Sequence, residues 1–466
     1  MKRPNILLIY TDQQRWDAMG VNGNDDIQTP NLDRLANEGV NFDHYFIQNP
    51  VCMPSRVSFL TGQYPSTLGI THMGVPVPED FVTLPKLLRN SGYHSANIGK
   101  LHFLPHANRD HSEVHPDYGF DHLEISDEPG CYEDAYRAWV RKEAPDQLDH
   151  LSLGLPPLAE QWHKMMNVKD GVFHPDERFP KEPVPFRGGD DYTHTAWVAS
   201  RSIQYMKERA QEGRPFLCVS GIYSPHSPWV APQRFLDMYD PEEVALPSFP
   251  PEADEKRNAE HYSDEELRLA RQGYYGMVSE VDHHVGRMLD SLDELGIADE
   301  TIVVFTSDHG EWLGEHLKYG KGYPGHDCVS RVPLLMRVPG IEGGHRVSSL
   351  VEGVDVVPTL LEACGASVPP HLQGQSLCSA FRGGDGPEKD VALMEFTGWK
   401  MIRSENYRYV THAEGQEFLY DLSAEWGEYR DVSDDPDHAD ALAEHRHLLI
   451  KRLVEMEKPR KKTWGY

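Results

Sequence analysis

The chain has 466 residues, which is enough for one large domain and a smaller second one. Its 45 basic and 74 acidic residues give a formal net charge of −29, so we expect neither a nucleic-acid partner nor a membrane partner. The six cysteines form no C-x-x-C pair, no run of about 18 apolar residues is present, and the N-terminal apolar run is too short for a signal peptide. These features predict a cytoplasmic protein without disulfides.

The first third of the chain begins an alternation of strands and helices. The segment NILLIY (5–10) is a continuous apolar run, which is typical of a central strand covered on both faces. A helix is predicted over 29–39, with proline at its first position and glycine just past its end. A second helix is predicted over 82–92, and the next strand over 93–100.

The alternation continues in the middle of the chain after an irregular stretch. Weak periodicity over 105–190 indicates a long insertion of loops and short helices. A helix is predicted over 191–213 and a strand over 215–222. A long helix that opens with a capping box is predicted over 263–296, and a further buried strand over 301–311.

Polar residues follow four of these predicted strands. They are Asp12 and Gln13, Lys100 and His102, His226, and Asp308 and His309. Alternating strands and helices predict an α/β fold with an open sheet, whose ligands bind beyond the carboxyl ends of the strands. We therefore expect these four groups to converge on one site.

The pattern changes after about residue 385. The segments 400–412 and 417–422 predict antiparallel strands joined by turns, and 440–458 predicts a closing helix. We therefore divide the chain into a large α/β domain over 1–385 and a small α+β subdomain over 386–466.

Four of the side chains at strand ends offer two carboxylates, an amide oxygen and an imidazole: Asp12, Gln13, Asp308 and His309. A donor set of mostly oxygen atoms suits a hard divalent cation such as Ca²⁺, Mg²⁺ or Mn²⁺. An aspartate after a strand is also a common turn former. Two such groups, far apart in the sequence and both after apolar strands, favour a metal site.

Cys52 lies in the segment NPVCMPSRVSFLTG. It is distant in the sequence from the proposed metal ligands, so only the fold could bring it near them. A thiol is a poor ligand for a hard cation because thiolates prefer softer metals, whereas an oxygen nucleophile would suit it. If a helix begins near Ser55, its N-terminus and Arg56 direct positive charge at an anion near Cys52. The alternative is that Cys52 is a structural cysteine.

This segment resembles the signature of the type I, formylglycine-dependent sulfatase family, C-x-P-x-R followed by T-G. The matching residues are Cys52, Pro54, Arg56, Thr61 and Gly62. Similar segments follow in the family's order over essentially the whole chain: PNILLIYTDQQR, TPNLDRLANEGVNFDHYF, GYHSANIGKLHF, PHSPW and TIVVFTSDHGEWLGEH. The resemblance implies an alkaline phosphatase superfamily fold, with a central mixed sheet flanked by helices and a small C-terminal α+β subdomain. It also implies hydrolysis of sulfate esters with release of inorganic sulfate.

The resemblance further implies that a formylglycine-generating maturase oxidises Cys52 and that the hydrated aldehyde supplies the attacking oxygen. One divalent cation, Ca²⁺ or alternatively Mn²⁺, would be bound by Asp12, Gln13, Cys52, Asp308 and His309. The family often has aspartate in place of Gln13 and asparagine in place of His309. Here the chain resembles choline-sulfatase-like enzymes and phosphonate monoester hydrolases instead.

The same motifs imply roles for five further catalytic side chains. Arg56 would orient the hydrated aldehyde. Lys100 and His102 would contact the sulfate oxygens and the second hydroxyl, with His102 as the base for sulfate release. His226 would hydrogen-bond the bridging oxygen or the sulfate, and Lys321 would neutralise the leaving group.

The expected substrate is a small sulfate ester, such as a sulfated sugar, an aryl sulfate or an alkyl sulfate. His72 is a candidate for substrate contact, as are four residues of the insertion: His106, Arg109, His111 and His115. One alternative is a phosphonate monoester hydrolase or phosphodiesterase with the same site, and another is a protein that binds sulfated ligands without turnover. The basic tail 458–466 is either a solvated end or a contact between the subunits of a homo-oligomer.

Overall fold

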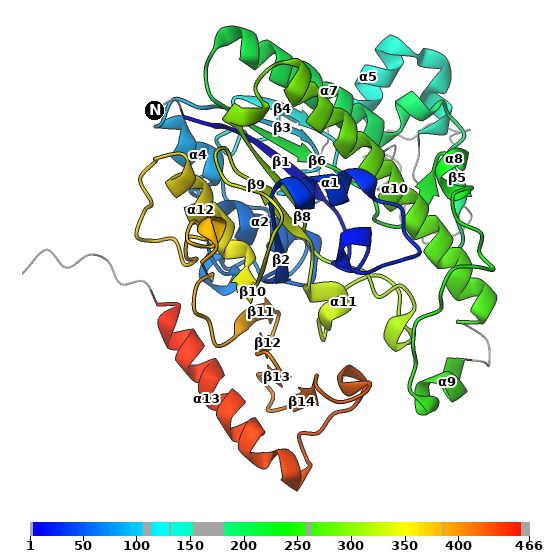
Figure 1. Cartoon of the computed structure of the whole chain (residues 1–466), viewed down its shortest axis with the longest axis vertical. Coiled ribbons are helices and arrows are strands. Elements are labelled where there is room, and N and C mark those ends of the chain that lie inside the picture. Colours follow the sequence, from blue (N-terminus) through cyan, green and yellow to red (C-terminus); the bar gives the residue numbers. More distant parts are fainter. Residues whose placement is uncertain are drawn as a thin grey trace, which may run out of the picture.

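The computed structural model describes residues 3–105, 113–129, 132–151, 181–257, 262–384 and 386–457. These residues form a large α/β body, with a smaller C-terminal unit packed against one end of it (Figure 1). The α/β class is therefore as predicted. Three candidate substrate residues, His106, Arg109 and His111, and the tail 458–466 lie outside the described residues.

The large body is built on an eight-stranded mixed sheet with the strand order β10-β2-β9-β8-β1-β6-β3-β4. The strand β9 is antiparallel to both of its neighbours, and the other neighbouring pairs are parallel. The strands are β1 (Asn5–Thr11), β2 (Val40–Phe46), β3 (His94–Gly99), β4 (His122–Ile125), β6 (Phe216–Gly221), β8 (Thr301–Ser307), β9 (Leu334–Arg337) and β10 (His345–Glu352). The four predicted strands of this body are confirmed as β1, β3, β6 and β8.

Helices cover both faces of this sheet. One layer contains α2 (Cys52–Thr61), α4 (Leu84–Arg89) and α12 (Val356–Ala363), and the other contains α1 (Pro30–Glu38), α7 (His194–Glu212) and α10 (Asp264–Glu294). In β1, Ile6 and Leu8 pack with the first layer, whereas Leu7 and Ile9 pack with the second. Successive strand residues point to opposite faces, so a strand between two helical layers is apolar at every position. Figure 1 shows α7 and α10 side by side across one face.

Three predicted helices are confirmed as α1, α7 and α10, and the one predicted over 82–92 is the shorter α4. The described part of the predicted insertion contains β4, α5 (Ala135–Glu143) and β5 (Val184–Pro185), which pairs with β7 (Val230–Ala231). The short helices elsewhere are α3 (Pro65–Leu68), α8 (Gln233–Leu236), α9 (Pro251–Arg257) and α11 (Asp327–Ser330).

The C-terminal unit is an antiparallel sheet with the order β11-β12-β13-β14, together with α13 (Ala439–Glu455). Its strands are β11 (Ala392–Phe396), β12 (Trp399–Arg403), β13 (Tyr407–His412) and β14 (Glu417–Asp421). The predicted antiparallel strands and closing helix are confirmed, and β11 is an additional strand. Apolar side chains of the sheet, such as Leu393 and Leu419, pack with Leu442 and Leu449 of α13.

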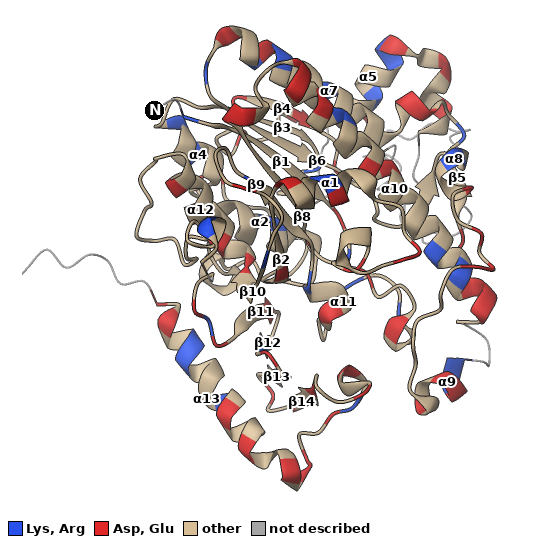
Figure 2. Cartoon of the chain, viewed as in Figure 1, with Lys and Arg blue, Asp and Glu red and all other residues tan. Residues whose placement is uncertain are grey.

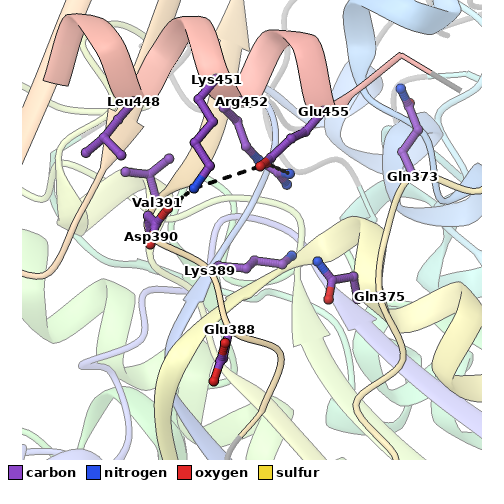
Figure 3. A pocket seen from close by; sticks show the side chains of 10 residues that line it. All are labelled: Gln373, Gln375, Glu388, Lys389, Asp390, Val391, Leu448, Lys451, Arg452 and Glu455. Carbon is purple, nitrogen blue, oxygen red and sulfur yellow. Dashed lines mark hydrogen bonds and ion pairs between the residues drawn. The ribbon is translucent and has the colours of Figure 1, made fainter. Parts of the chain in front are cut away.

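A polar pocket of about 230 Å³ lies between α13 and the large body (Figure 3). Lys451 and Arg452 extend toward it from α13, and Lys389 lies on the opposite side. Arg452 and Lys389 each contact the buried carboxylate of Glu352 at 2.6 Å. Ion pairs as well as apolar contacts therefore join α13 to the body.

The excess of acidic residues is spread over the outer helices, where basic residues are interspersed (Figure 2). Within the described ranges, no helix is both long and apolar enough to cross a membrane. The cysteines that the structure describes are all free: Cys52, Cys218, Cys328, Cys364 and Cys378.

Candidate active site

The carboxyl ends of four neighbouring strands meet at one edge of the large sheet. The strands β8, β1, β6 and β3 are adjacent in this order and parallel to one another. Thr11 of β1 pairs in register with Ser307 of β8, so the next residues, Asp12 and Asp308, lie side by side. The backbone N–H of Gln13 donates to Asp308 Oδ1 at 3.1 Å. The predicted convergence of the strand ends is confirmed here.

Two glycines bring Lys100 to the same edge. Gly99 has a φ of 93°, and a Cβ at this position would lie 2.1 Å from the carbonyl oxygen of Gly221. A Cβ on Gly221 would in turn lie 2.0 Å from the carbonyl oxygen of Lys100, so only glycine fits at either position. The Lys100 ammonium lies 2.6 Å from Asp12 Oδ2. Burial alone raises the pKa of the Asp12 carboxyl, but the neighbouring positive groups, led by Lys100, together outweigh burial and hold this pKa well below its ordinary value.

Cys52 is the first residue of α2, so this helix begins at Cys52 itself rather than near Ser55. The Cys52 Sγ lies 3.2 Å from His309 Nε2 and 3.7 Å from Asp12 Oδ1. Burial, together with the Asp12 carboxylate, raises the pKa of the Cys52 thiol to about 12. The side chain therefore lies at the positive end of a helix, yet as a thiol it is protonated and poorly nucleophilic at neutral pH.

Arg56 joins the first turns of α2 to three strand ends. Its Nε donates to Asp308 Oδ2 at 2.6 Å, and its Nη1 and Nη2 donate to the carbonyl oxygens of Lys100 and Thr11, both at 3.1 Å. The guanidinium lies 4.5 Å from the centre of the Tyr10 ring. Because Arg56 is buried and each of its three side-chain nitrogens donates to a strand end, it fixes the position of α2 relative to the sheet.

The donor atoms of four side chains lie within 4.8 Å of one another: Asp12, Cys52, Asp308 and His309. His309 Nδ1 lies 2.8 Å from the carbonyl oxygen of Gly310, which assigns the proton to Nδ1 and leaves a lone pair on Nε2. Burial lowers the pKa of His309 and favours this neutral ring. The Nε2 lone pair faces carboxylate oxygens of Asp12 and Asp308 at 3.4 and 3.6 Å. Acceptors that face one another in a buried site are stable when a cation lies between them, so these residues fit a metal ion.

Gln13 supplies a further donor to this group. Its side-chain Nε2 donates to Glu311, and its Oε1 is buried with no hydrogen-bond partner among the described residues. Glu311 was not predicted as part of the site. Its other oxygen accepts from the backbone N–H groups of Leu313 (3.1 Å) and Gly320, and burial raises its pKa to about 7. Glu311 directly follows Asp-His-Gly in the sequence. The sequence alone does not tell whether such an acid binds a metal ion itself or orients another residue, here Gln13, that does.

Lys321 contacts both Cys52 and His226. Lys321 Nζ lies 2.5 Å from Cys52 Sγ and 3.0 Å from His226 Nε2. His226 Nδ1 lies 2.6 Å from the carbonyl oxygen of Ser227, so the proton is on Nδ1 and Nε2 accepts from the Lys321 ammonium. Burial and the charge of Lys321 lower the pKa of His226 to about 3, which keeps this ring neutral.

His102 lies two residues beyond Lys100 and is only 1% exposed. It has a left-handed φ of 57°, which is uncommon for a residue other than glycine. Asp127 supports this turn, because its Oδ1 accepts from the backbone N–H groups of Leu101 and His102, both at 2.8 Å. Asp127 is a second residue that the sequence did not reveal.

Two of the predicted substrate residues, His72 and His115, lie within the described part of the chain. His72 is exposed, and its neighbour Thr71 accepts a hydrogen bond from Asn49 at 3.0 Å, just before α2. His115 is half-buried and packs against Tyr118, with ring centroids 5.8 Å apart. Their roles in substrate binding stay predictions.

Comparison with known proteins gives a consistent result. A sulfatase family model matches residues 4–366, and a model of the N-sulphoglucosamine sulphohydrolase C-terminal region matches 314–458. The arylsulfatase of Clostridium perfringens is 29% identical over 98% of this chain and 95% of its own length. The N-acetylglucosamine-6-O-sulfatase of Bacteroides thetaiotaomicron is 30% identical over 81% of this chain and 70% of its own length.

A solved structure with a different activity is also similar. The phosphonate monoester hydrolase of Agrobacterium radiobacter superposes with a TM-score of 0.81 and 26% identity. The match covers 98% of this chain and 96% of that structure. The similarity therefore includes both the large body and the C-terminal unit.

Proposed function

The chain belongs to the sulfatase family and is a sulfuric ester hydrolase, and from this premise we propose that residue 52 acts as formylglycine on a small sulfate ester. The observation that carries the proposal is the position of the Cys52 side chain. It lies at the start of α2, beside His309 Nε2, with the Lys321 ammonium 2.5 Å away. An oxygen nucleophile on this carbon would face the positive charge that an anionic ester requires. A maturase has to supply the conversion of the thiol.

We propose that one divalent cation, Ca²⁺ in preference to Mn²⁺, is bound by Asp12, Gln13, residue 52, Asp308 and His309. The mostly oxygen donor set supports this assignment, as does the buried Gln13 Oε1, which has no hydrogen-bond partner in the part of the chain that the structure describes. When bound, the cation lowers the pKa of the attacking hydroxyl and stabilises the charge of the transferred group. Lys100 and Arg56 each pair with one ligand carboxylate and so keep both carboxylates in place.

The lysines and histidines of the site stabilise negative charge and transfer protons. Lys100 and Lys321 attract the anionic group in a chain that is otherwise strongly acidic. Neutral His226 accepts from Lys321, and so orients the ammonium toward the bridging oxygen, where negative charge develops as the S–O bond breaks. His102 is the proposed base that removes the proton of the second hydroxyl, so that sulfate departs and the aldehyde returns.

A phosphonate monoester is a second candidate substrate. It is favoured by the structural similarity to a phosphonate monoester hydrolase over nearly the whole chain. Its transferred group is also tetrahedral and anionic, so the same cation and the same lysines would stabilise it.

The two candidates are separated by initial rates of the matured enzyme on 4-nitrophenyl sulfate and 4-nitrophenyl phenylphosphonate, which share one leaving group. We expect the higher kcat/KM on the sulfate ester, and a higher value on the phosphonate would reverse the assignment. The mass of the peptide that contains residue 52 is measured on the same sample. Full activity with an unconverted Cys52 thiol would contradict the formylglycine proposal.

A further inference from the structure

The loop that carries Lys321 has little regular structure of its own. We call residues 312–326, between β8 and α11, the Lys321 loop. Many of its residues have positive φ angles: Leu313, Gly314, His316, Leu317, Gly320, Gly322 and Gly325. Turn hydrogen bonds close parts of the loop, such as that from Gly314 N to Lys318 O at 2.9 Å. A backbone of this kind depends on its tertiary contacts for its position.

The C-terminal unit contacts this loop on the N-terminal side of Lys321. The ring of Tyr429 stacks on the ring of His316, with centroids 3.9 Å apart and planes 8° apart. The Tyr429 hydroxyl also accepts a hydrogen bond from the backbone N–H of His316 at 3.0 Å. This contact therefore fixes both the side chain and the backbone of the loop five residues before Lys321.

The same unit contacts the loop on the C-terminal side of Lys321. Tyr323 packs against Trp399 of β12, with ring centroids 3.9 Å apart. Arg408 of β13 is only 1% exposed and donates to the carbonyl oxygen of Gly325. Lys321 thus lies between two attachments to the C-terminal unit, while its ammonium contacts Cys52.

One part of this contact has the composition of a second metal site, namely His316, His326 and Glu428. The two imidazole rings are stacked, with centroids 4.2 Å apart and planes 9° apart. An ion binds a ring nitrogen in the plane of the ring, and one ion cannot lie in two parallel planes that are stacked at this distance. Glu428 is also paired with Arg408 at 3.4 Å. The group is therefore a packed junction between the loop and the C-terminal unit.

We propose that the C-terminal unit positions Lys321 for the reaction, with Trp399 and Arg408 of its sheet and Tyr429 of the turn after β14 as positioning residues. The inference rests on the proposed function, in which Lys321 stabilises the leaving oxygen. The ammonium is within 3.0 Å of both His226 and Cys52, and a shift of the loop by about 1 Å would break both contacts, which is enough to lower the rate substantially. The defect should be largest for esters with poor leaving groups, which need most help from the positive charge.

The test compares Trp399→Leu and Tyr429→Leu with Tyr407→Leu as a matched control. Tyr407 lies on the same sheet but packs against His445 of α13, with ring centroids 5.2 Å apart. In Trp399→Leu and Tyr429→Leu we expect kcat for an alkyl sulfate to fall roughly ten-fold or more, while kcat for 4-nitrophenyl sulfate changes by less than about two-fold. Tyr429→Phe keeps the stacked ring and should restore most of the lost rate. The control should leave the ratio of the two rates unchanged.

Two further measurements separate positioning from a general loss of stability. In a Lys321→Met background, Trp399→Leu should have no further effect on the alkyl sulfate, because both changes remove the same contribution. Hydrogen–deuterium exchange of the peptide over 313–322 should be faster in Trp399→Leu than in the wild type or the control. The exchange measurement does not depend on turnover.

The outcomes distinguish this inference from the proposed function. If the wild type hydrolyses sulfate esters but Trp399→Leu and Tyr429→Leu lose both rates equally, or the exchange of the Lys321 loop is unchanged, the positioning role is wrong. If the matured wild type hydrolyses neither sulfate ester, the proposed function is wrong. The exchange experiment remains informative in that case, because unchanged exchange in Trp399→Leu would show that Trp399 does not hold the Lys321 loop in place.

Discussion

The cluster of acidic and basic side chains around Cys52 and the ionic network beneath α13 are both buried, and both join residues that are far apart in the chain. In the network beneath α13, Glu352 accepts from Lys389 and Arg452 at 2.6 Å and from the Tyr64 hydroxyl at 2.8 Å. Lys389 also reaches Asp355 at 2.5 Å. Each carboxylate oxygen of these two acids accepts at least one hydrogen bond.

The cluster around Cys52 differs from this network because several of its hydrogen-bond acceptors face one another instead of facing donors. His309 Nε2 faces the carboxylates of Asp12 and Asp308, and Gln13 Oε1 has no hydrogen-bond partner among the described residues. Buried polar groups are ordinarily satisfied, so acceptors that converge on one point indicate a binding site for a cation. Burial and charge alone would not have separated the two regions, because both contain acids and bases with almost no solvent exposure.

The largest difference in activity between variants of the two regions is expected at residue 52. We expect Cys52→Ser to fold normally but to lose multiple turnover by about 10³-fold or more, because a serine alcohol has no aldehyde route for releasing sulfate. The measurements are the kinetics on 4-nitrophenyl sulfate and the thermal midpoint Tm of the same preparation. Rapid multiple turnover by this variant would contradict the mechanism.

Removal of a carboxylate should have opposite consequences in the two regions. Asp308→Asn is expected to lose the bound divalent cation, since its charge and a ligand oxygen are both affected. Glu352→Gln, the control from the network beneath α13, should keep the cation. Elemental analysis after dialysis gives the ratio of ion to chain, and an unchanged ratio in Asp308→Asn would refute this ligand assignment.

A change of stability without a change of chemistry is expected beneath α13. Arg452→Met leaves Glu352 with one fewer buried cation and should lower the free energy of unfolding by about 3–5 kcal/mol, as other broken buried pairs do. The neighbouring Lys451→Met breaks only exposed pairs, with Asp390 and Glu455, and should cause no measurable change. Both residues line the pocket in Figure 3. Urea unfolding measures the free energy of unfolding of both variants. If Arg452→Met also lost bound metal, the network beneath α13 could no longer be distinguished from the cation-binding cluster around Cys52.

Local patterns in the sequence were sufficient to predict the central strands of the large sheet and the convergence of polar residues at their carboxyl ends. The apolar run of β1 predicts two covered faces, and the polar residues after β1, β3, β6 and β8 predict the convergence that the register of these strands confirms. The start of α2 differs from the position near Ser55 that the sequence suggested, because the helix begins directly at Cys52 and Val51 provides no side-chain cap to mark its start. The additional strand β11 was missed because its pairing depends on β12 and not on a pattern of its own.

The supporting residues of the site were not predictable from the sequence. Glu311 and Asp127 act through hydrogen bonds to Gln13 and to the backbone at His102, and an acid beside a loop has no sequence feature that indicates such a partner. The attachment of Tyr429 to the Lys321 loop joins residues more than 100 positions apart, so only the folded chain reveals it.

The central claim is that the buried donors at the strand ends and an oxygen on residue 52 surround one cation. The most direct measurement is a crystal structure of the matured enzyme with its metal identified by anomalous scattering. We expect one ion between Asp12, Gln13, Asp308 and His309, with an oxygen of residue 52 about 2.3–2.6 Å from it if the ion is Ca²⁺. An ion bound elsewhere in the protein, with residue 52 outside its coordination shell, would contradict the account.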